Sequence, residues 1–154
     1  MAVAGITKAV VLALNSGPSG AKYDAVYGGE PLLIRALVAL SKAGIRSARI
    51  ICHEGHRGKI AALIGTARTR IALGYDISAV RTGEMLSEAV SRLVEEWDTS
   101  FLLFEANKVV HATFFAQFAQ FVGSPKPVLV VYKHVWLTEG KVAFASAFPD
   151  KFKV

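Results

Sequence analysis

One stretch near the N-terminus constrains the fold more than any other part of the sequence. An apolar run at 10–14 enters a loop of small residues, 15–21, which ends at a lone lysine, Lys22. A Gly-Gly pair at 28–29 then precedes Pro31, a residue suited to the first turn of a helix because that turn does not need its N–H. Loops with few Cβ atoms let backbone N–H groups approach an anion closely. This order of buried strand, small-residue loop and helix start is typical of phosphate sites in α/β proteins, although it matches neither common glycine-rich phosphate motif.

Apolar strands and amphipathic helices alternate along the rest of the chain. The connections between strands are long enough to cross over the sheet, so we expect a three-layer, Rossmann-like α/β fold with a mainly parallel sheet and helices on both faces. The predicted strands are 6–14, 49–52, 76–80, 100–104, 127–132 and 141–148, and the predicted helices are 31–43, 56–70, 84–97 and 113–121, with Gly140 turning the chain into the last strand.

The carboxyl ends of the predicted strands indicate where a ligand would bind. In such sheets ligands lie beyond these ends. The loops after Leu14, Val80 and Phe104 are therefore the candidate site.

Length, charge and cysteine content exclude several classes of protein. The 154 residues suit one domain, 1–154, and the net charge of +6 is scattered rather than gathered into a basic stripe with aromatic residues. We therefore expect an anionic small ligand and no nucleic acid. We also expect no membrane span, because no stretch of about 18 apolar residues is present. With one cysteine, Cys52, and no signal peptide, the sequence predicts a cytoplasmic protein.

One short cluster could suggest a metal centre. Cys52, His53 and His56 lie close together in the sequence. A closed zinc site needs four ligands, and no second cysteine or histidine pair stands nearby. We interpret the cluster as a packed cysteine with loop histidines.

The order and spacing of the first loop resemble the N-terminal signature of sugar-phosphate nucleotidyltransferases. That signature reads L-A-A-G-x-G-x-R, then K, then V-G-G-K-P-L-L, and the inositol-1-phosphate cytidylyltransferase and molybdenum-cofactor guanylyltransferase branches are the most similar in pattern. Leu12 and Ala13 open the matching segment, and Asn15, Ser16 and Gly17 fall on G-x-G. Further on, Lys22 falls on the first lysine, and Gly28 and Gly29 fall on the glycine pair.

The resemblance implies roles for individual residues. Lys22 would be the catalytic cation that neutralises phosphate charge, although a lysine there could equally be a surface residue. The segment 81–87 resembles the family's base-contacting loop, although it could simply be a strand-to-helix loop in which Thr82 or Glu84 caps the helix. The implied nucleotide-binding residues are Leu12, Ala13, Leu14, Asn15, Ser16, Gly17, Ser19, Gly20, Gly83 and Ser87.

Three charged positions of the family's reaction centre differ here. Ser19 replaces an arginine, Glu30 replaces a lysine, and Asn107 replaces the aspartate that holds Mg²⁺. A neutral amide is a weaker ligand for a hard cation than a carboxylate, and Lys108 would repel the cation further. Glu105 could substitute as the metal ligand, although strand alternation points it to the other side from Ala106.

Two functions from different classes follow from these matches and departures. An active enzyme would use Mg²⁺ to join a nucleoside triphosphate to a phosphorylated sugar, polyol or similar alcohol, releasing pyrophosphate. A catalytically inactive relative would act as a binding or scaffold module, through homo-oligomerisation or a partner subunit. A small-molecule sensor of another Rossmann-like family is a third alternative. Full-size members of the family are longer, so the resemblance implies a truncated or shortened relative.

Overall fold

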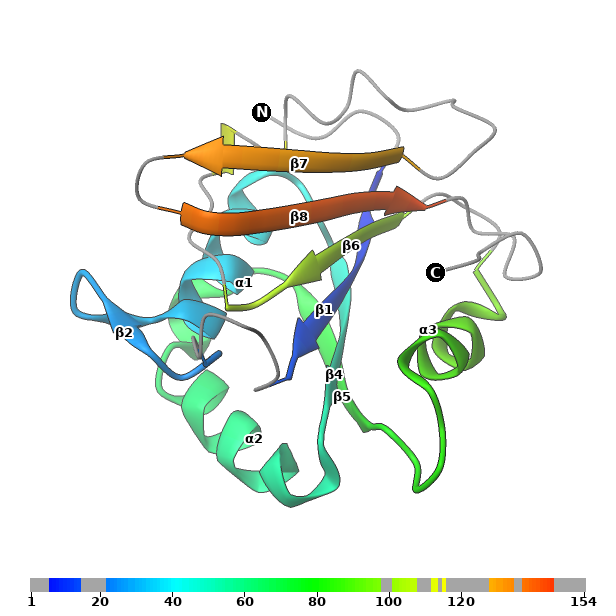
Figure 1. Cartoon of the computed structure of the whole chain (residues 1–154). Helices are drawn as coiled ribbons and strands as arrows, with labels where there is room; N and C mark the ends of the chain where they lie inside the picture. The colour runs from blue at the N-terminus through cyan, green and yellow to red at the C-terminus, as the bar shows by residue number, and fades with distance from the viewer. Residues whose placement is uncertain are drawn as a thin grey trace.

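A six-stranded sheet forms the centre of the molecule (Figure 1). The structure, a computed structural model, describes residues 6–14, 22–97, 101–107, 112–113, 115, 128–134 and 137–145. Across the sheet the strand order is β5-β4-β1-β6-β8-β7. The strands are β1 (Lys8–Ala13), β4 (Ser47–Cys52), β5 (Gly74–Ala79), β6 (Phe101–Glu105), β7 (Val128–His134) and β8 (Leu137–Ala145).

The sheet is mainly parallel, as the sequence predicts. β1 pairs in parallel with β4 on one side and with β6 on the other, and β4 pairs in parallel with β5. β8 is antiparallel to β6, and β7 is antiparallel to β8. Five of the six residues of β1 are buried, which suits a central strand that is covered on both faces.

Helices cover both faces of the sheet and complete the three layers (Figure 1). On one face, α1 (Leu32–Lys42) and α2 (Arg57–Gly65) pack through residues such as Leu37 and Ile60 onto Val11 and Ile50. On the other face, α3 (Leu86–Val94) packs onto alternate residues of the same strands, including Val10 and Ile51. The expected three-layer α/β fold is thus confirmed.

A small hairpin between β1 and α1 is absent from the sequence prediction. β2 (Val26–Tyr27) and β3 (Glu30–Pro31) pair antiparallel around a two-residue turn. Gly28 and Gly29 form this turn with φ of 60° and 81°. Two consecutive positive φ angles match the twist of a tight hairpin and strongly favour glycine, which explains the Gly-Gly pair in local terms.

Several predicted boundaries differ from the structure. The helix predicted over 56–70 is interrupted, because α2 spans Arg57–Gly65 between two 3₁₀ turns, η1 (Glu54–His56) and η2 (Arg68–Arg70). α3 is shorter than the predicted 84–97, and the Glu88 carboxylate accepts a hydrogen bond from the Met85 N–H at its start (2.8 Å). Gly140 lies inside β8, opposite Tyr132, and does not turn the chain into it.

Two further predictions concern the segment 113–121 and membrane-spanning helices. Most of the helix predicted over 113–121 lies outside the described residues, although 112, 113 and 115 are helical. Among the helices that the structure describes, none combines the length and hydrophobicity needed to span a membrane.

Candidate functional site

The fold brings the ends of the predicted site strands to one edge of the sheet. β1, β5 and β6 are parallel members of one sheet and therefore end at the same edge. The Ala106 N–H donates to the Leu12 carbonyl (2.9 Å), so the chain beyond β6 stays beside the end of β1. Leu12, Ala13 and Leu14 lie at this edge, whereas Asn15, Ser16, Gly17, Ser19 and Gly20 lie outside the described residues.

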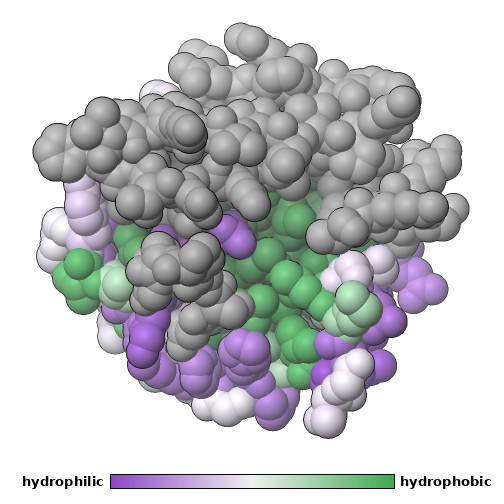
Figure 2. Space-filling view, in the orientation of Figure 1, coloured by the Kyte–Doolittle hydropathy of each residue, from purple (hydrophilic) through white to green (hydrophobic). Residues whose placement is uncertain are grey.

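The sheet face that carries α3 presents an apolar surface toward this edge. Leu12 and Ile51 are buried in the cluster on that face, and Val80 and Leu103 are half-buried at its border. Figure 2 shows hydrophobic residues gathered over β1, β4 and β5, bordered by hydrophilic residues. The face next to the candidate loops therefore offers apolar contact area.

The start of α1 is not available to an anion in the way that the sequence suggests. Pro31 is the N-cap of α1 and has no N–H. The N–H groups of Leu32 and Leu33 donate to the carbonyls of Ala25 and Tyr23, both at 2.9 Å. The carbonyls of the turn that follows Lys22 therefore accept the hydrogen bonds of these N–H groups. A phosphate bound here would depend on the preceding loop and on the exposed Lys22 rather than on the helix terminus.

The segment after Lys22 is anchored beneath α2. The Tyr23 ring is fully buried, and its centroid lies 5.8 Å from that of His56. Asp24 forms an ion pair with Lys59 of α2, and this hydrogen-bonded pair lowers the pKa of Asp24 and raises that of Lys59. The exit of the candidate phosphate loop is thus tied to the core on one side and to α2 on the other.

The Cys52 cluster does not assemble a metal centre among the described residues. No group of three or more histidine, cysteine or carboxylate side chains converges in the part of the chain that the structure describes. Cys52 is fully buried at the end of β4, and burial raises the pKa of its thiol. This agrees with a packed cysteine.

A network of charged hydrogen bonds holds the loop after β5. Gly83 turns the chain with φ of 78°. The Glu84 carboxylate accepts from Arg92 Nε (2.8 Å) and NH2 (3.0 Å), and from the Arg81 N–H (2.8 Å). These donors lower the pKa of Glu84 to about 2, with the Arg92 side chain as the largest cause.

The same loop shows what sequence reasoning missed. Neither Thr82 nor Glu84 caps α3; that role belongs to Glu88, while Glu84 organises the loop itself. Arg92 also reaches the carbonyl of Ala79 at the end of β5 (3.4 Å). Nothing in the sequence marks Arg92, because a separation of eight residues becomes a contact only once the loop folds back. Ser87, half-buried in the first turn of α3, lies just beyond this network.

Asn107 and Glu105 provide oxygen atoms where β6 ends. Asn107 is only 9% exposed, and among the described residues its Oδ1 has no hydrogen-bond partner. Glu105, the last residue of β6, is half-buried in register with Leu12 and so lies on the α3 face of the sheet. A buried carbonyl oxygen without a partner costs roughly 1–3 kcal/mol, and a donor or cation supplied by a ligand would offset this cost.

The charge of Glu30 is paired with that of an arginine. Its carboxylate pairs with Arg70 of η2, on the outer side of α1. The negative charge at this position is therefore neutralised by a neighbouring residue of the chain.

Comparison with known proteins identifies the fold. No family model matches the sequence, and no curated protein sequence matches it. Many solved structures are similar in fold, including the following three. One, assigned as a glucose-1-phosphate thymidylyltransferase from Bacillus anthracis, has a TM-score of 0.66 at 11% identity, covering 93% of this chain and 73% of that one.

The two others are similar over comparable spans. A 4-diphosphocytidyl-2C-methyl-D-erythritol synthase from Anaerococcus prevotii has a TM-score of 0.64 at 13% identity, covering 99% of this chain and 79% of the other. The inositol-1-phosphate CTP transferase of T. maritima has a TM-score of 0.58 at 12% identity, covering 92% and 71%. The chain therefore has the mainly parallel, Rossmann-like α/β fold of these nucleotidyltransferases.

Proposed function

We propose that this protein binds a nucleoside triphosphate at the carboxyl edge of its sheet and transfers the nucleotidyl group to a phosphorylated sugar, polyol or similar alcohol. The observation that carries the proposal is the buried Oδ1 of Asn107, which has no hydrogen-bond partner in the part of the chain that the structure describes and lies beside the end of β1. The fold around it is shared with nucleotidyltransferases. In fold families of this kind, ligands bind beyond the carboxyl ends of the strands. The comparisons support the fold, and the activity is our inference from it.

The described residues suit two parts of such a reaction. Lys22, exposed at the end of the 15–21 loop, would neutralise phosphate charge as the bond between the α-phosphorus and pyrophosphate breaks. The loop containing Gly83 would contact the base, with its own backbone and with the neighbouring half-buried apolar residues Val80 and Leu103. An oxygen of the acceptor's phosphate would form the new bond to the α-phosphorus.

We propose that the oxygen donors at the end of β6 hold a divalent cation. Asn107 Oδ1 and the Glu105 carboxylate would hold Mg²⁺, which commonly takes one or two protein oxygens and leaves its other positions to water and phosphates. When bound, the cation would neutralise charge on the triphosphate. With one carboxylate and one amide, we expect weak binding of Mg²⁺ alone and tighter binding together with nucleotide.

Calorimetric titration tests the proposal. The protein is titrated with CTP, GTP, UTP and dTTP, each with and without Mg²⁺, and pyrophosphate release is followed with glucose 1-phosphate and inositol 1-phosphate as acceptors. We expect saturable binding that strengthens with Mg²⁺, and pyrophosphate release that requires an acceptor. Binding of none of the nucleotides refutes the proposal, and binding without pyrophosphate release favours a catalytically inactive binding module.

A matched pair of variants locates the bound phosphate. Lys22→Gln and Arg46→Gln each remove one exposed cation, the first at the candidate loop and the second in the turn between α1 and β4. We expect Lys22→Gln to weaken nucleotide binding by about tenfold, as for the loss of one charge-assisted hydrogen bond, and Arg46→Gln to leave it unchanged. Equal losses in both variants would indicate a response to net charge alone.

A further inference from the structure

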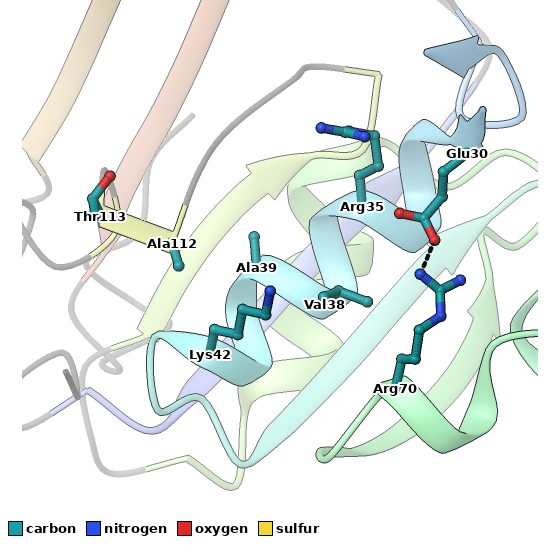
Figure 3. Close-up of a pocket in the computed structure, with 8 residues that line it drawn as sticks. All are labelled: Glu30, Arg35, Val38, Ala39, Lys42, Arg70, Ala112 and Thr113. Atoms are coloured by element: carbon teal, nitrogen blue, oxygen red, sulfur yellow. Dashed lines mark ion pairs between the residues drawn. The ribbon is translucent and has the colours of Figure 1, made fainter. Parts of the chain in front are cut away.

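A hollow lies on the outer side of α1, separate from the face that carries α3. Its volume is about 710 Å³, within the roughly 300–1,000 Å³ typical of small-molecule sites. Figure 3 shows the side chains that line it. Val38 and Ala39 of α1 form an apolar floor, with Ala112 and Thr113 on one side and the Glu30–Arg70 pair on the other.

The charges around this hollow are predominantly positive. Arg35, Lys42 and Arg70 contribute three cations, and Glu30 contributes one carboxylate. Arg35 and Lys42 lie two turns apart on α1, so about 10 Å of helix separates their Cα atoms. A ligand that spans the hollow therefore meets cations at both ends and an apolar surface between them.

The cations of this hollow keep hydrogen-bonding capacity for a ligand. Arg35 NH1 donates to the Tyr27 carbonyl (3.3 Å), and the guanidinium lies over the Tyr27 ring, 5.4 Å from its centroid, which holds the side chain in place. The Lys42 side chain forms no ion pair or hydrogen bond with any residue that the structure describes. Arg70 is bound to Glu30, but its side chain is 55% exposed.

We infer that this hollow binds a small organic phosphate, with the phosphate held by its cations and the organic part lying over Val38 and Ala39. Guanidinium groups match the paired oxygens of a phosphate, and a dianion suits a net surplus of two positive charges. The Glu30 carboxylate occupies Arg70 in the structure, so the phosphate competes with it for that guanidinium. This inference does not depend on the proposed nucleotidyltransferase activity.

Phenyl phosphate is a suitable probe because it joins a phosphate to an apolar ring. Its binding to the full chain is measured by calorimetry at low salt and compared with that of inorganic phosphate and of benzyl alcohol. We expect saturable binding of phenyl phosphate that is stronger than that of either fragment and weakens as salt increases. Binding of inorganic phosphate as strong as that of phenyl phosphate would overturn the role of the apolar floor.

Three variants place the anion at the hollow. We expect Arg70→Gln to weaken phenyl phosphate binding by about tenfold, and Glu30→Gln to strengthen it because the competing carboxylate is gone. Arg68→Gln is the matched control. Arg68 is an exposed arginine of the same 3₁₀ turn as Arg70, but it does not line the hollow. Thermal melts of each variant confirm that it is folded, and Lys42→Gln replaces Arg70→Gln if the latter is not.

Two outcomes would overturn the inference. One is an equal loss in Arg68→Gln and Arg70→Gln, which would mean that net charge alone attracts the probe, or no gain in Glu30→Gln, which would mean that Glu30 does not compete with the probe for Arg70. The other is binding that disappears in Lys22→Gln and persists in Arg70→Gln, which would place the anion at the loop after β1. Since Arg70 lies outside the proposed nucleotide site, unchanged nucleotide binding in Arg70→Gln separates the two sites.

Discussion

Replacing Tyr23 with phenylalanine should stabilise the protein. Tyr23 is fully buried, and its hydroxyl has no hydrogen-bond partner among the described residues. Burying an unpaired hydroxyl costs roughly 1–3 kcal/mol of stability. Removing the hydroxyl leaves a small void, and the lost packing offsets part of the stability that is gained. We therefore expect Tyr23→Phe to raise the free energy of unfolding by about 1 kcal/mol, which corresponds to about 2–4 °C in Tm for a domain of this size.

The pH dependence gives this prediction a second readout. Burial raises the pKa of Tyr23 above its ordinary value near 10, so above that pH the unfolded chain loses this proton before the folded chain does. This tyrosine therefore lowers the stability of the wild type as the pH rises above about 10, and the phenylalanine variant lacks that loss. The advantage of Tyr23→Phe should consequently grow at alkaline pH.

Urea unfolding followed by circular dichroism at pH 7 and pH 10.5 measures both effects. Tyr27→Phe is the control, because the Tyr27 side chain is half exposed and its hydroxyl can reach water; its stability should match the wild type at pH 7. A loss of 1 kcal/mol or more in Tyr23→Phe would refute the reasoning, since it would show that the hydroxyl has a partner.

Three further predictions concern the candidate site. Donors from Arg92 and Arg81 hold the pKa of Glu84 at about 2, so the stability that Glu84 contributes above its unfolded pKa near 4.5 is lost as the pH falls toward 2. Glu84→Gln should therefore flatten the acid side of a plot of Tm against pH, and an unchanged slope would contradict this. Gly83→Ala should lower the free energy of unfolding by about 1 kcal/mol because of its positive φ alone, since an added Cβ meets no atom within 4 Å. Gly58 has a helical conformation in α2, so Gly58→Ala should raise the free energy of unfolding by up to about 0.5 kcal/mol, and the Tm values of the two variants should move in opposite directions. Asn107→Asp places a carboxylate in a buried position, so the Tm of this variant should fall in the absence of metal and should rise with Mg²⁺ by more than the Tm of the wild type does. An equal response to Mg²⁺ in both proteins would argue against a cation at this position.

Local pattern was enough to predict most of the elements. The apolar runs around Val10 and Ile50 indicate strands buried on both faces, and the helical spacing of Leu33, Leu37 and Leu40 indicates the buried side of α1. The alternation of strands and helices predicts a parallel sheet, because strands joined by crossovers run in the same direction. The boundaries of α2 and β8 were less accurate, since the ends of elements depend on capping contacts and on pairing with distant strands.

The candidate site divides in the same way. The sequence places Lys22, Gly83 and Asn107 after strands, and therefore at the carboxyl edge of the sheet, but says nothing about what their neighbours do there. The carbonyls of Tyr23 and Ala25 accept hydrogen bonds from the first N–H groups of α1. This arrangement depends on the path of the chain after the loop, which the sequence does not reveal. The partnership of Glu84 with Arg92 and of Glu30 with Arg70 likewise requires turns that bring distant residues together.

By itself, then, the sequence determined the layers: hydrophobic periodicity is a local property, and it dictates which segments must be buried and on how many sides. Tertiary structure alone decided the insertion of β8 between β6 and β7, the burial of Asn107 and the cationic hollow on α1. Each of these depends on residues far apart in the chain meeting at a distance of a few ångströms. Such meetings are set by the packing of whole elements, and short-range pattern does not encode them.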